Sequence, residues 1–394
     1  MTTASTAHDT AAALPGAAAL LAAYRPGPSS AFFAGPSRTL LAEGVRATVA
    51  DPARAADALR AARADGLAHP VVVGAIPFSP GAPSRLFVPE QVDWAPPLRE
   101  DPLLQLPGAR TAPATWRQRP VPAPEVYRDA VAEAVRRLTG DPELTKVVLA
   151  RTLELTTPGG ADLPSMLHRL ARRDPDGYTF AVPAGGDATL IGASPELLVS
   201  RRGTAVSANP LAGSAARSTD LAEDVRRAAA LLESPKDLHE HAVVVEAVRA
   251  ALAPLCADLT VPEQPTLVRT AAMWHLSTTV TGTLADPATS ALDLALALHP
   301  TPAVCGTPTD RARHLIGELE PFDRGLYTGV VGWGDLAGDG EWVVTLRCAE
   351  ADGDLLRLFA GAGIVAASDP AAELAETGAK FRTFLHAVGL EESK

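Results

Sequence analysis

Strand-like and helix-like segments alternate along this chain without a regular strand-helix repeat, and this pattern restricts the fold more than any other feature. Irregular alternation of this kind favours a mixed α+β architecture. The patterns predict strands near residues 31–34, 71–76, 146–155, 178–182, 188–193, 273–283, 326–333, 342–349 and 355–360. They predict helices near residues 52–64, 126–140, 219–233, 235–254, 288–298, 309–318 and 370–388, and an irregular proline-containing connection over 104–124.

Length and charge narrow the class of protein. The 394 residues, 47% of them hydrophobic, are enough for two ordinary domains or one large core. A formal net charge of −11 argues against a nucleic-acid partner, because binding phosphates requires a basic face. No apolar stretch reaches the length that spans a bilayer, so we expect no membrane association.

The N-terminus and the cysteines indicate the compartment. Residues 1–24 are rich in alanine and contain no Lys or Arg, so they lack the basic start of a secretory signal. We expect this segment to be a ragged or helical tail on a cytoplasmic protein. Cys256, Cys305 and Cys348 have neither metal-ligand nor disulfide spacing, which predicts reduced, packed thiols.

Lysine is rare in this chain, and its few positions are informative. Of 35 basic residues only four are lysine, and the three internal ones are Lys146, Lys236 and Lys380. Arginine can replace lysine wherever a permanent charge suffices, but it cannot lose its proton near neutral pH. The retained lysines are therefore candidates for chemistry, with survival by chance as the alternative.

Two predicted helices carry carboxylates on one face each. Residues 234–235 and 368–370 supply a capping residue and a first-turn proline, which fix where each helix begins. The resulting faces carry Asp237 with Glu240, and Glu373 with Glu376 and Lys380. Two carboxylate pairs suit magnesium, which takes oxygen ligands and keeps waters that a substrate can displace. Two solvated helix faces are the alternative, but the lysine-containing strand favours the metal interpretation.

Lys146 and Glu196 are candidates for a base and an acid. Strand alternation places Lys146 and Arg151 on opposite faces, so one basic side chain must face the core. A desolvated lysine has a lowered pKa and can act as a base, although a lysine at a strand end can also reach solvent. Glu196 lies in a turn over residues 192–198, where apolar neighbours favour the protonated carboxyl group that a general acid requires.

Glycine motifs and one arginine suggest anion binding. The segments 209–214 and 361–364 are expected to follow strands, so their N–H groups could bind a carboxylate, although short glycine motifs are weak evidence. Neither matches a P-loop or a dinucleotide fingerprint. Arg347, expected on a strand over 343–348, could bind a carboxylate with both guanidinium nitrogens; an ordinary salt bridge is the alternative.

Eight motifs occur in one order between residues 145 and 380. They are Lys-Val-Val-Leu-Ala-Arg, Gly-Ala-Ser-Pro-Glu-Leu-Leu, Asn-Pro-Leu-Ala-Gly-Ser, Lys-Asp-Leu-His-Glu-His, Trp-His-Leu-Ser-Thr, His-Pro-Thr-Pro-Ala-Val-Cys-Gly, Gly-Ala-Gly-Ile and Glu-Thr-Gly-Ala-Lys. In this order they resemble the chorismate-utilising enzymes, and most closely the isochorismate synthase branch. The resemblance implies one α+β catalytic domain over 25–394, with two stacked antiparallel sheets, helices outside and a magnesium site between them.

The resemblance also implies roles for individual residues. Lys146 would activate water for attack at C2 of chorismate, and Glu196 would protonate the departing C4 hydroxyl. The magnesium ligands would be Glu240 and Glu376, with Asp237 and Glu373 nearby through water. The substrate would be bound by Gly213, Ser214, His275, Ala303, Tyr327, Leu346, Arg347, Gly361 and Lys380, of which Arg347 and Tyr327 receive the enolpyruvyl carboxylate. A monomer without a redox cofactor is expected.

Ala303 bears on which member of the family this is. Pyruvate-eliminating relatives usually carry threonine at this position, so the alanine favours a reaction that stops at isochorismate. Salicylate synthase, which eliminates pyruvate from isochorismate, is the second candidate. A catalytically silent, magnesium-dependent chorismate-binding protein is the third. Siderophore, menaquinone and antibiotic pathways all remain open.

Overall fold

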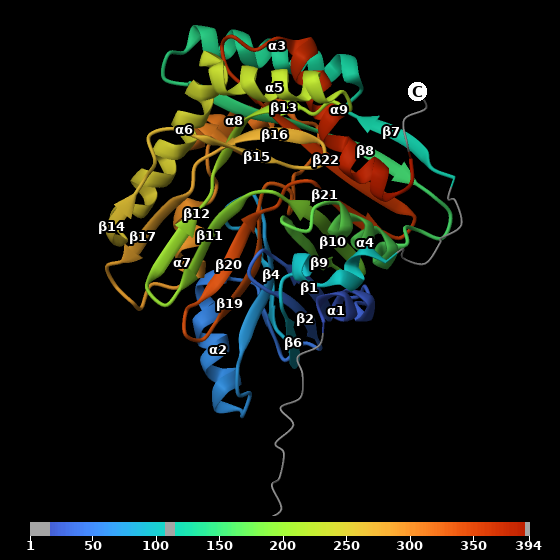
Figure 1. Ribbon diagram of the computed structural model, residues 1–394, viewed down its shortest axis with the longest axis vertical. Helices are drawn as coiled ribbons and strands as arrows, with labels where there is room; N and C mark the ends of the chain where they lie inside the picture. Colours follow the sequence, from blue (N-terminus) through green and yellow to red (C-terminus); the bar gives the residue numbers. More distant parts are fainter. Residues whose placement is uncertain (1–15, 107–114, 391–394) are drawn as a thin grey trace, which may run out of the picture.

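Two large antiparallel sheets stack face to face in the computed structural model, which describes residues 16–106 and 115–390 (Figure 1). The first sheet contains, in spatial order, β18 (Gly306–Thr307), β8 (Lys146–Thr156), β22 (Leu355–Ile364), β21 (Cys348–Asp352), β10 (Ala188–Ser194), β9 (Tyr178–Gly185), β1 (Ser30–Ala34), β2 (Thr39–Glu43) and β6 (Gln91–Ala95), with β7 (Arg117–Val121) paired to β8. The second contains β14 (Cys256–Thr260), β17 (Val280–Leu284), β12 (Ala205–Ala208), β11 (Leu197–Arg202), β20 (Gly340–Val344), β19 (Val330–Asp335), β4 (Val71–Ile76), β5 (Arg85–Val88) and β3 (Ala47–Val49). The expected α+β fold is confirmed.

A third, smaller sheet lies at one end of the two-sheet stack. It contains β13 (Leu211–Ala216), β16 (Met273–Ser277) and β15 (Thr266–Arg269). In the described residues the α-helices are α1 (Ala17–Ala23), α2 (Ala55–Ala64), α3 (Pro124–Gly140), α4 (Leu163–Arg173), α5 (Leu221–Glu233), α6 (Pro235–Leu252), α7 (Ala291–Leu298), α8 (Thr309–Leu319) and α9 (Pro370–Ala387). Short 3-10 turns occupy Pro52–Arg54, Leu98–Glu100 and Pro102–Gln105. Figure 1 shows the small sheet beside α5 and α9.

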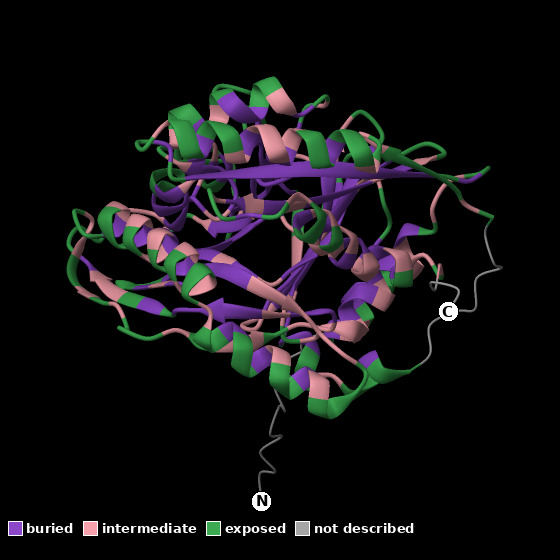
Figure 2. Cartoon of the chain, turned by 90° about the horizontal axis from the view of Figure 1, so that it is seen from above, coloured by how far each residue is buried: buried purple, intermediate pink, exposed green. Residues whose placement is uncertain are grey.

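The core lies in layers between and outside the sheets. Phe33 and Phe180 of the first sheet pack against Val73, Val331 and Val343 of the second. Each side chain of this size contributes roughly 1.5–3 kcal/mol when fully buried. The outer face of the first sheet is covered by α1, α3, α4, α8 and α9, and that of the second by α2, α6 and α7. Figure 2 shows the strands largely buried between helices with exposed outer faces.

Strand β8 has both faces buried, as a continuous run of burial along its length shows. Val147 and Leu149 pack beneath α3 and α8, whereas Ala150 faces the second sheet. The predicted alternation is therefore confirmed. It puts Lys146 on the inner face and Arg151 on the outer face, where the guanidinium lies over aromatic rings of α3 and α9.

Several predicted elements differ from the structure. The expected strand over 273–283 is two strands of different sheets, β16 and β17, separated by Thr278 and Thr279. The expected strand over 342–349 is also two strands, because the chain turns at Arg347, where φ is +46°. Arg347 is therefore not on a strand, as was expected. The glycine motif over 209–214 follows β12 directly, as expected, and continues into β13, whereas the motif over 361–364 lies within β22 and not after a strand.

The helical alternative for the N-terminal segment is confirmed for residues 17–23, whereas the connection before α3 is more regular than expected. Residues 17–24 of the expected tail form α1 and the residue after it, and Leu20, Leu21 and Tyr24 are buried in the core with α4. Residues 1–15 lie outside the described residues. The expected irregular connection over 104–124 contains β7, which pairs with β8. Helix α4 was not predicted.

The described residues also bear on the expectations about membrane-spanning helices and about the cysteines. None of the helices described between residues 16 and 390 is both long and apolar enough to cross a membrane. Cys256, Cys305 and Cys348 are free thiols; Cys305 and Cys348 are packed in the interior, as expected, whereas Cys256 is half-buried.

Candidate active site

A cavity lies where the small sheet meets the ends of the two large sheets. All of the predicted site residues except Lys146 and Glu373 line it, namely Glu196, Gly213, Ser214, Asp237, Glu240, His275, Ala303, Tyr327, Leu346, Arg347, Gly361, Glu376 and Lys380. The cavity also has lining residues that were not predicted: Val148, Pro195, Leu211, Ala212, Lys236, Val304, Thr328, Phe359, Ala360 and Gly363. Residues from distant parts of the chain thus converge on one place.

Lys146 lies at the edge of this cavity, at the start of β8. Its side chain is 2% exposed, and its Nζ lies 2.8 Å from Oε1 of Glu240 on α6. Gly363, which is paired with Val148 across the neighbouring strand, leaves room for this contact. A Cβ atom at Gly363 would collide with the Glu240 carboxylate and lie 3.0 Å from Cε of Lys146. The glycine therefore permits the buried pair, a role that the motif alone did not reveal.

Helices α6 and α9 begin as the sequence predicted. The Ser234 hydroxyl accepts the N–H of Asp237 at the start of α6, with Pro235 in the first turn. Asp369 accepts the N–H groups of Ala371 and Ala372 at the start of α9. These caps fix the phase of both helices, and with it the direction of their carboxylates.

Each internal lysine pairs with one of the predicted metal-binding carboxylates. Lys146 pairs with Glu240 at 2.8 Å, Lys236 with Glu373 at 3.1 Å, and Lys380 with Glu376 at 2.6 Å. Lys380 also donates to the carbonyl of Gly361 at 2.8 Å. Lys236, which had no predicted role, joins α6 to α9 through its carboxylate partner.

Burial and the charges around the cavity shift the pKa values of the carboxyl groups in different directions. Burial acts to raise the pKa of Glu240, but Lys146, Lys380 and Lys236 outweigh it and leave that pKa lowered. The pKa of Glu373 is raised, first by burial and then by the nearby Glu376. Glu240 is therefore held as a carboxylate.

The four predicted metal-binding carboxylates do not form a metal site by themselves. Within residues 16–106 and 115–390, no three His, Cys, Asp or Glu side chains are arranged to hold a metal ion. Glu240, Glu376 and Asp237 nevertheless line one cavity, and all are carboxylates, the ligand type that magnesium prefers. The donor chemistry fits magnesium with two direct protein ligands and water, and the magnesium prediction stays a prediction.

Glu196 occupies the tight turn between β10 and β11. Its N–H donates to Oγ of Ser194 at 3.2 Å, and that hydroxyl donates to the carbonyl of Val344 at 2.6 Å. The side chain is 2% exposed. Burial raises its pKa to about 7, although the Leu211 N–H and the charges of Lys146 and Arg347 act in the opposite direction. The carboxyl group can therefore hold a proton near neutral pH, as its apolar surroundings predicted.

Ser214, His275 and Arg347 form a hydrogen-bonded row along the cavity wall. Nη2 of Arg347 lies 3.3 Å from Nε2 of His275, and Nδ1 of His275 lies 2.7 Å from Oγ of Ser214. Because a guanidinium only donates, Nε2 is the acceptor and Nδ1–H donates to the serine. Burial, followed by Arg347 and Lys380, lowers the pKa of His275 well below its usual value. The ring stays neutral, and the serine O–H is free to donate to a ligand.

An aromatic pair and a buried ion pair support other parts of the cavity wall. Tyr327 stacks on Phe359, with ring centroids 4.9 Å apart and planes at 11°. Arg324 binds both carboxylate oxygens of Glu320 and donates to the carbonyls of Val148 and Val304. Such a bidentate buried pair fixes geometry at the cavity wall.

The fold and the site together define a class of protein. The cavity is lined by Lys236, Lys380, Arg347 and the carboxyl group of Glu196, whose pKa is about 7, and the buried Lys146 lies at its edge. This is the arrangement of an enzyme that binds a small anionic substrate and transfers protons to or from it.

The particular family follows from comparison with known proteins. Residues 103–389 match the family described as chorismate binding enzyme. This chain belongs to that family.

Relatives with assigned names are similar over most of their length. "Isochorismate synthase DhbC" of Bacillus subtilis is 54% identical over 332 residues, which are 83% of this chain and 82% of the relative. "Isochorismate synthase EntC" of Escherichia coli is 43% identical over 82% of this chain and 83% of the relative. A crystal structure described as putative 2,3-dihydroxybenzoate-specific isochorismate synthase, DhbC from Bacillus anthracis, has a TM-score of 0.89 and 50% identity, and covers 95% of this chain and all of that one.

Proposed function

We propose that this protein is an isochorismate synthase, an isomerase that converts chorismate to isochorismate. Relatives named for this activity share up to 54% of their residues with the chain over most of its length. The observation that carries the proposal is that Glu196 and the Lys146–Glu240 pair meet at one shielded cavity. Moving a hydroxyl group from C4 to C2 requires one base and one acid, and these residues supply both.

Each of the two residues handles one proton. Lys146, as the neutral amine, takes a proton from water as the water oxygen bonds to C2 of chorismate. The ring double bonds shift, and the C4–O bond breaks as Glu196 donates its proton to the departing hydroxyl, which leaves as water. The product has the composition of the substrate, so no oxidant, reductant or further reactant is consumed.

Other residues bind the substrate carboxylates. Arg347 and Tyr327 would bind the enolpyruvyl carboxylate, and the Ser214 hydroxyl on β13 would donate a hydrogen bond to it. Burial acts to lower the pKa of Arg347, although Tyr327, Glu376 and Glu196 act to raise it. The cation is largely desolvated, which strengthens its attraction for a carboxylate.

Magnesium is proposed as the cofactor, with Glu240 and Glu376 as its ligands and Asp237 and Glu373 close by through water. When bound, the ion would supply positive charge that attracts the ring carboxylate of the substrate.

Ala303 favours an isochorismate synthase over a salicylate synthase. The alanine lines the cavity, so the place where eliminating relatives usually carry a threonine hydroxyl is apolar here. Pyruvate measured during the reaction tests this point directly. We expect isochorismate without pyruvate, whereas stoichiometric pyruvate would identify a salicylate synthase.

A further inference from the structure

A second, more open groove lies next to the catalytic cavity. It is lined by Arg173, Ser214, Ala216, Arg217, Ser218, Thr219, Arg227, Ala271, Ala272, Met273, Ala375, Glu376, Ala379 and Arg382. Ser214 and Glu376 line the catalytic cavity as well. Four arginines face this one groove in a chain whose net charge is −11. We refer to it below as the arginine groove.

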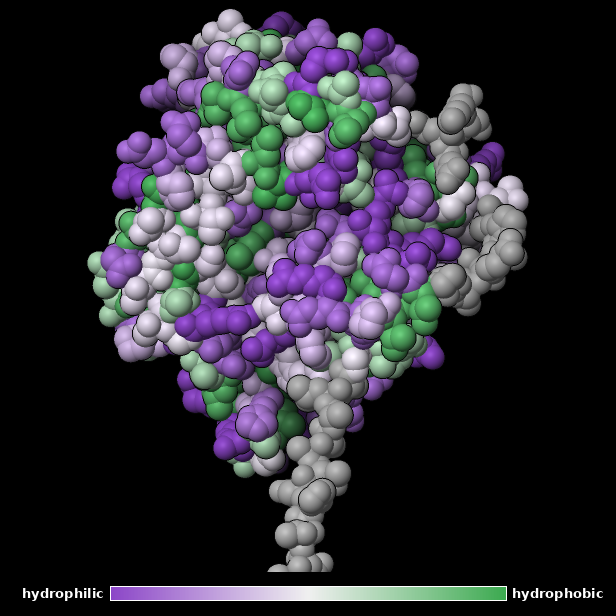
Figure 3. Space-filling model, viewed as in Figure 1, coloured by the Kyte–Doolittle hydropathy of each residue, from purple (hydrophilic) through white to green (hydrophobic). Residues whose placement is uncertain are grey.

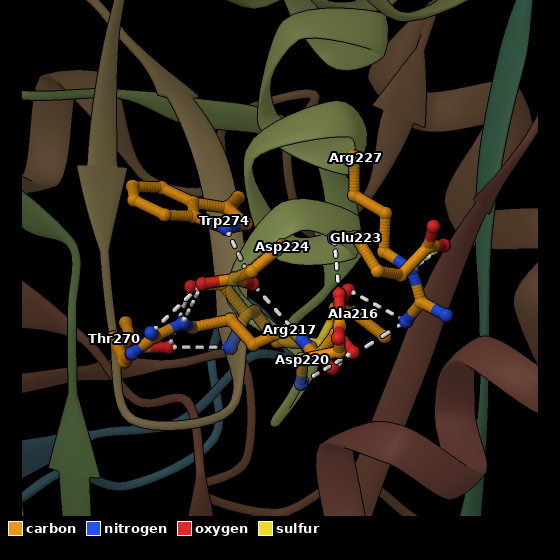
Figure 4. A network of polar contacts seen from close by, with 10 residues as sticks. Ala216, Arg217, Asp220, Glu223, Asp224, Arg227, Thr270 and Trp274 are labelled. Atoms are coloured by element: carbon orange, nitrogen blue, oxygen red, sulfur yellow. Dashed lines mark hydrogen bonds and ion pairs between the residues drawn. The ribbon is translucent and has the colours of Figure 1, made fainter.

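Two of the four arginines are already neutralised. Figure 4 shows Arg217 and Arg227 against the acidic residues of α5. Arg217 donates to Asp224 through two nitrogens, at 2.9 and 3.1 Å, and Arg227 donates to Glu223 at 2.8 Å. Asp224 also accepts the N–H of Ser218, and these hydrogen bonds, led by that from Arg217, lower its pKa to about 2. These arginines therefore hold the wall of the groove in place.

The other two arginines have no acidic partner in the described residues. Arg173 ends α4, Arg382 lies on α9, and neither makes an ion pair with a carboxylate within residues 16–106 and 115–390. Each acts on the other as a like charge, and burial together with Arg382 lowers the pKa of Arg173. Nε of Arg173 is buried without a hydrogen-bond partner in the same residues. Two adjacent cations of this kind constitute a place for an anion.

The groove leads from these cations towards the reacting groups. Arg173 and Arg347 both line one further small space, which Asp174 and Pro195 also line. Ala375 and Ala379 occupy the α9 face beside Arg382, and their short side chains leave the groove open. Figure 3 shows hydrophilic residues gathered over the region between α4 and α9.

We propose that the arginine groove is the entrance for the substrate, and that Arg173 and Arg382 capture its carboxylates before they reach Arg347. This inference rests on the proposed function, because it takes the substrate to be a dicarboxylate. A dianion approaching a chain of net charge −11 is repelled on average, and a local pair of cations offsets that repulsion along one path. Electrostatic capture acts on the rate of association and weakens as salt screens the charges.

The test compares association of chorismate with the wild-type enzyme and with the Arg173→Gln/Arg382→Gln variant. Stopped-flow tryptophan fluorescence, in the first milliseconds after mixing, gives the association rate constant over a range of ionic strength. We expect the variant to bind roughly tenfold more slowly at low salt and nearly as fast as wild type at about 0.5 M salt. The turnover number kcat should be unchanged, because neither residue touches the reacting atoms.

Two further variants separate capture from other effects. Arg173→Lys/Arg382→Lys keeps both charges and should associate about as fast as wild type. Arg54→Gln/Arg60→Gln makes the same change in net charge at exposed positions around the start of α2, and should have no effect on association. Equal rates for the glutamine variant and wild type, slow association of the lysine variant, or slow association of the α2 variant would each overturn the proposal. A wild-type enzyme that forms no isochorismate would instead contradict the proposed function.

Discussion

Lys146 and Glu240 form a buried ion pair whose Nζ and Oε1 atoms lie 2.8 Å apart. The pair joins the proposed base to a proposed metal ligand, so the state of one depends on the other. Against the effect of burial, Lys146 lowers the pKa of Glu240 and so holds that group as a carboxylate.

Replacement of Lys146 should stop the reaction. In Lys146→Gln, no amine is available to take a proton from water, and we expect the initial rate of isochorismate formation to fall by roughly 10²–10⁴-fold. Lys236→Gln is the matched control, because it removes another lysine that pairs with a carboxylate of the same cluster. The control should keep most of its kcat. Normal turnover in Lys146→Gln would rule out the lysine as the base.

The buried pair also predicts a stability effect. Lys146→Gln leaves Glu240 as an unpaired buried carboxylate, which typically costs about 3–5 kcal/mol. The double variant Lys146→Gln/Glu240→Gln removes both charges and should recover most of that loss. Urea unfolding of the two single variants, the double variant and the wild type gives the coupling energy. A double variant that is no more stable than Lys146→Gln would show that the pair is not coupled.

The raised pKa of Glu196 predicts two effects of rising pH: wild-type activity falls, and the stability of Glu196→Gln relative to wild type increases. The acid must be protonated, so wild-type activity should fall as the pH rises through about 7, the raised pKa of this group. Glu196→Gln should be nearly inactive at every pH. The pKa of Glu196 is higher in the folded protein than in the unfolded chain. The free energy of unfolding of the wild type therefore decreases as the pH rises from about 4.5 to about 7, and stays at the lower value above that range.

The stability of Glu196→Gln relative to wild type should therefore increase with pH. The gain between pH 4.5 and pH 8.5 should approach about 3 kcal/mol, which is the free energy that corresponds to the pKa shift. Urea unfolding at both pH values measures it. A difference in stability that is the same at the two pH values would mean that the folded protein does not raise this pKa.

Loss of Glu240 should weaken magnesium binding. Glu240→Gln removes a proposed direct ligand, and we expect the magnesium concentration for half-maximal activity to rise at least about tenfold. Glu246→Gln is the matched control, because Glu246 lies on the same helix, does not line the cavity and pairs with Arg249. Titration calorimetry with magnesium alone provides a reading that does not depend on turnover. Equal magnesium affinity in Glu240→Gln and wild type would remove Glu240 from the metal site.

The Ser214 hydroxyl should contribute to substrate binding. In Ser214→Ala, the hydrogen bond from this hydroxyl to a substrate carboxylate is lost, so KM should rise by roughly tenfold or more. His275 keeps its ring neutral through the accessible pH range, so the rise in KM should not depend on pH between 6 and 8. Steady-state kinetics at these pH values measure it, and an unchanged KM would contradict the assignment.

Local signals in the sequence were sufficient for some elements of this structure. Ser234 and Asp369 cap the helices that carry the carboxylates, and the apolar flanks of Glu196 are consistent with its raised pKa. The alternation along β8 gave the inner position of Lys146 because a strand has only two faces. Each of these features depends on residues close together in the chain.

The remaining features depend on contacts between distant segments. The turn at Arg347 interrupts an apolar run that otherwise predicts one strand. Backbone hydrogen bonds from the Thr345 N–H to the Gly329 carbonyl, and from the Thr328 N–H to the Thr345 carbonyl, hold the segment just before this turn. The pairing of Lys236 with Glu373 requires α6 and α9 to be adjacent. Sequence periodicity carries no information about either contact.

Incubation of the purified protein with chorismate and magnesium, followed by chromatographic separation of the products, tests the central claim most directly. We expect isochorismate in a reversible mixture with chorismate, and loss of the product when EDTA is added. Salicylate together with pyruvate would identify a salicylate synthase, and unchanged chorismate at saturating magnesium would show a protein that only binds it. Either of these last two results would contradict the assignment of this protein as an isochorismate synthase.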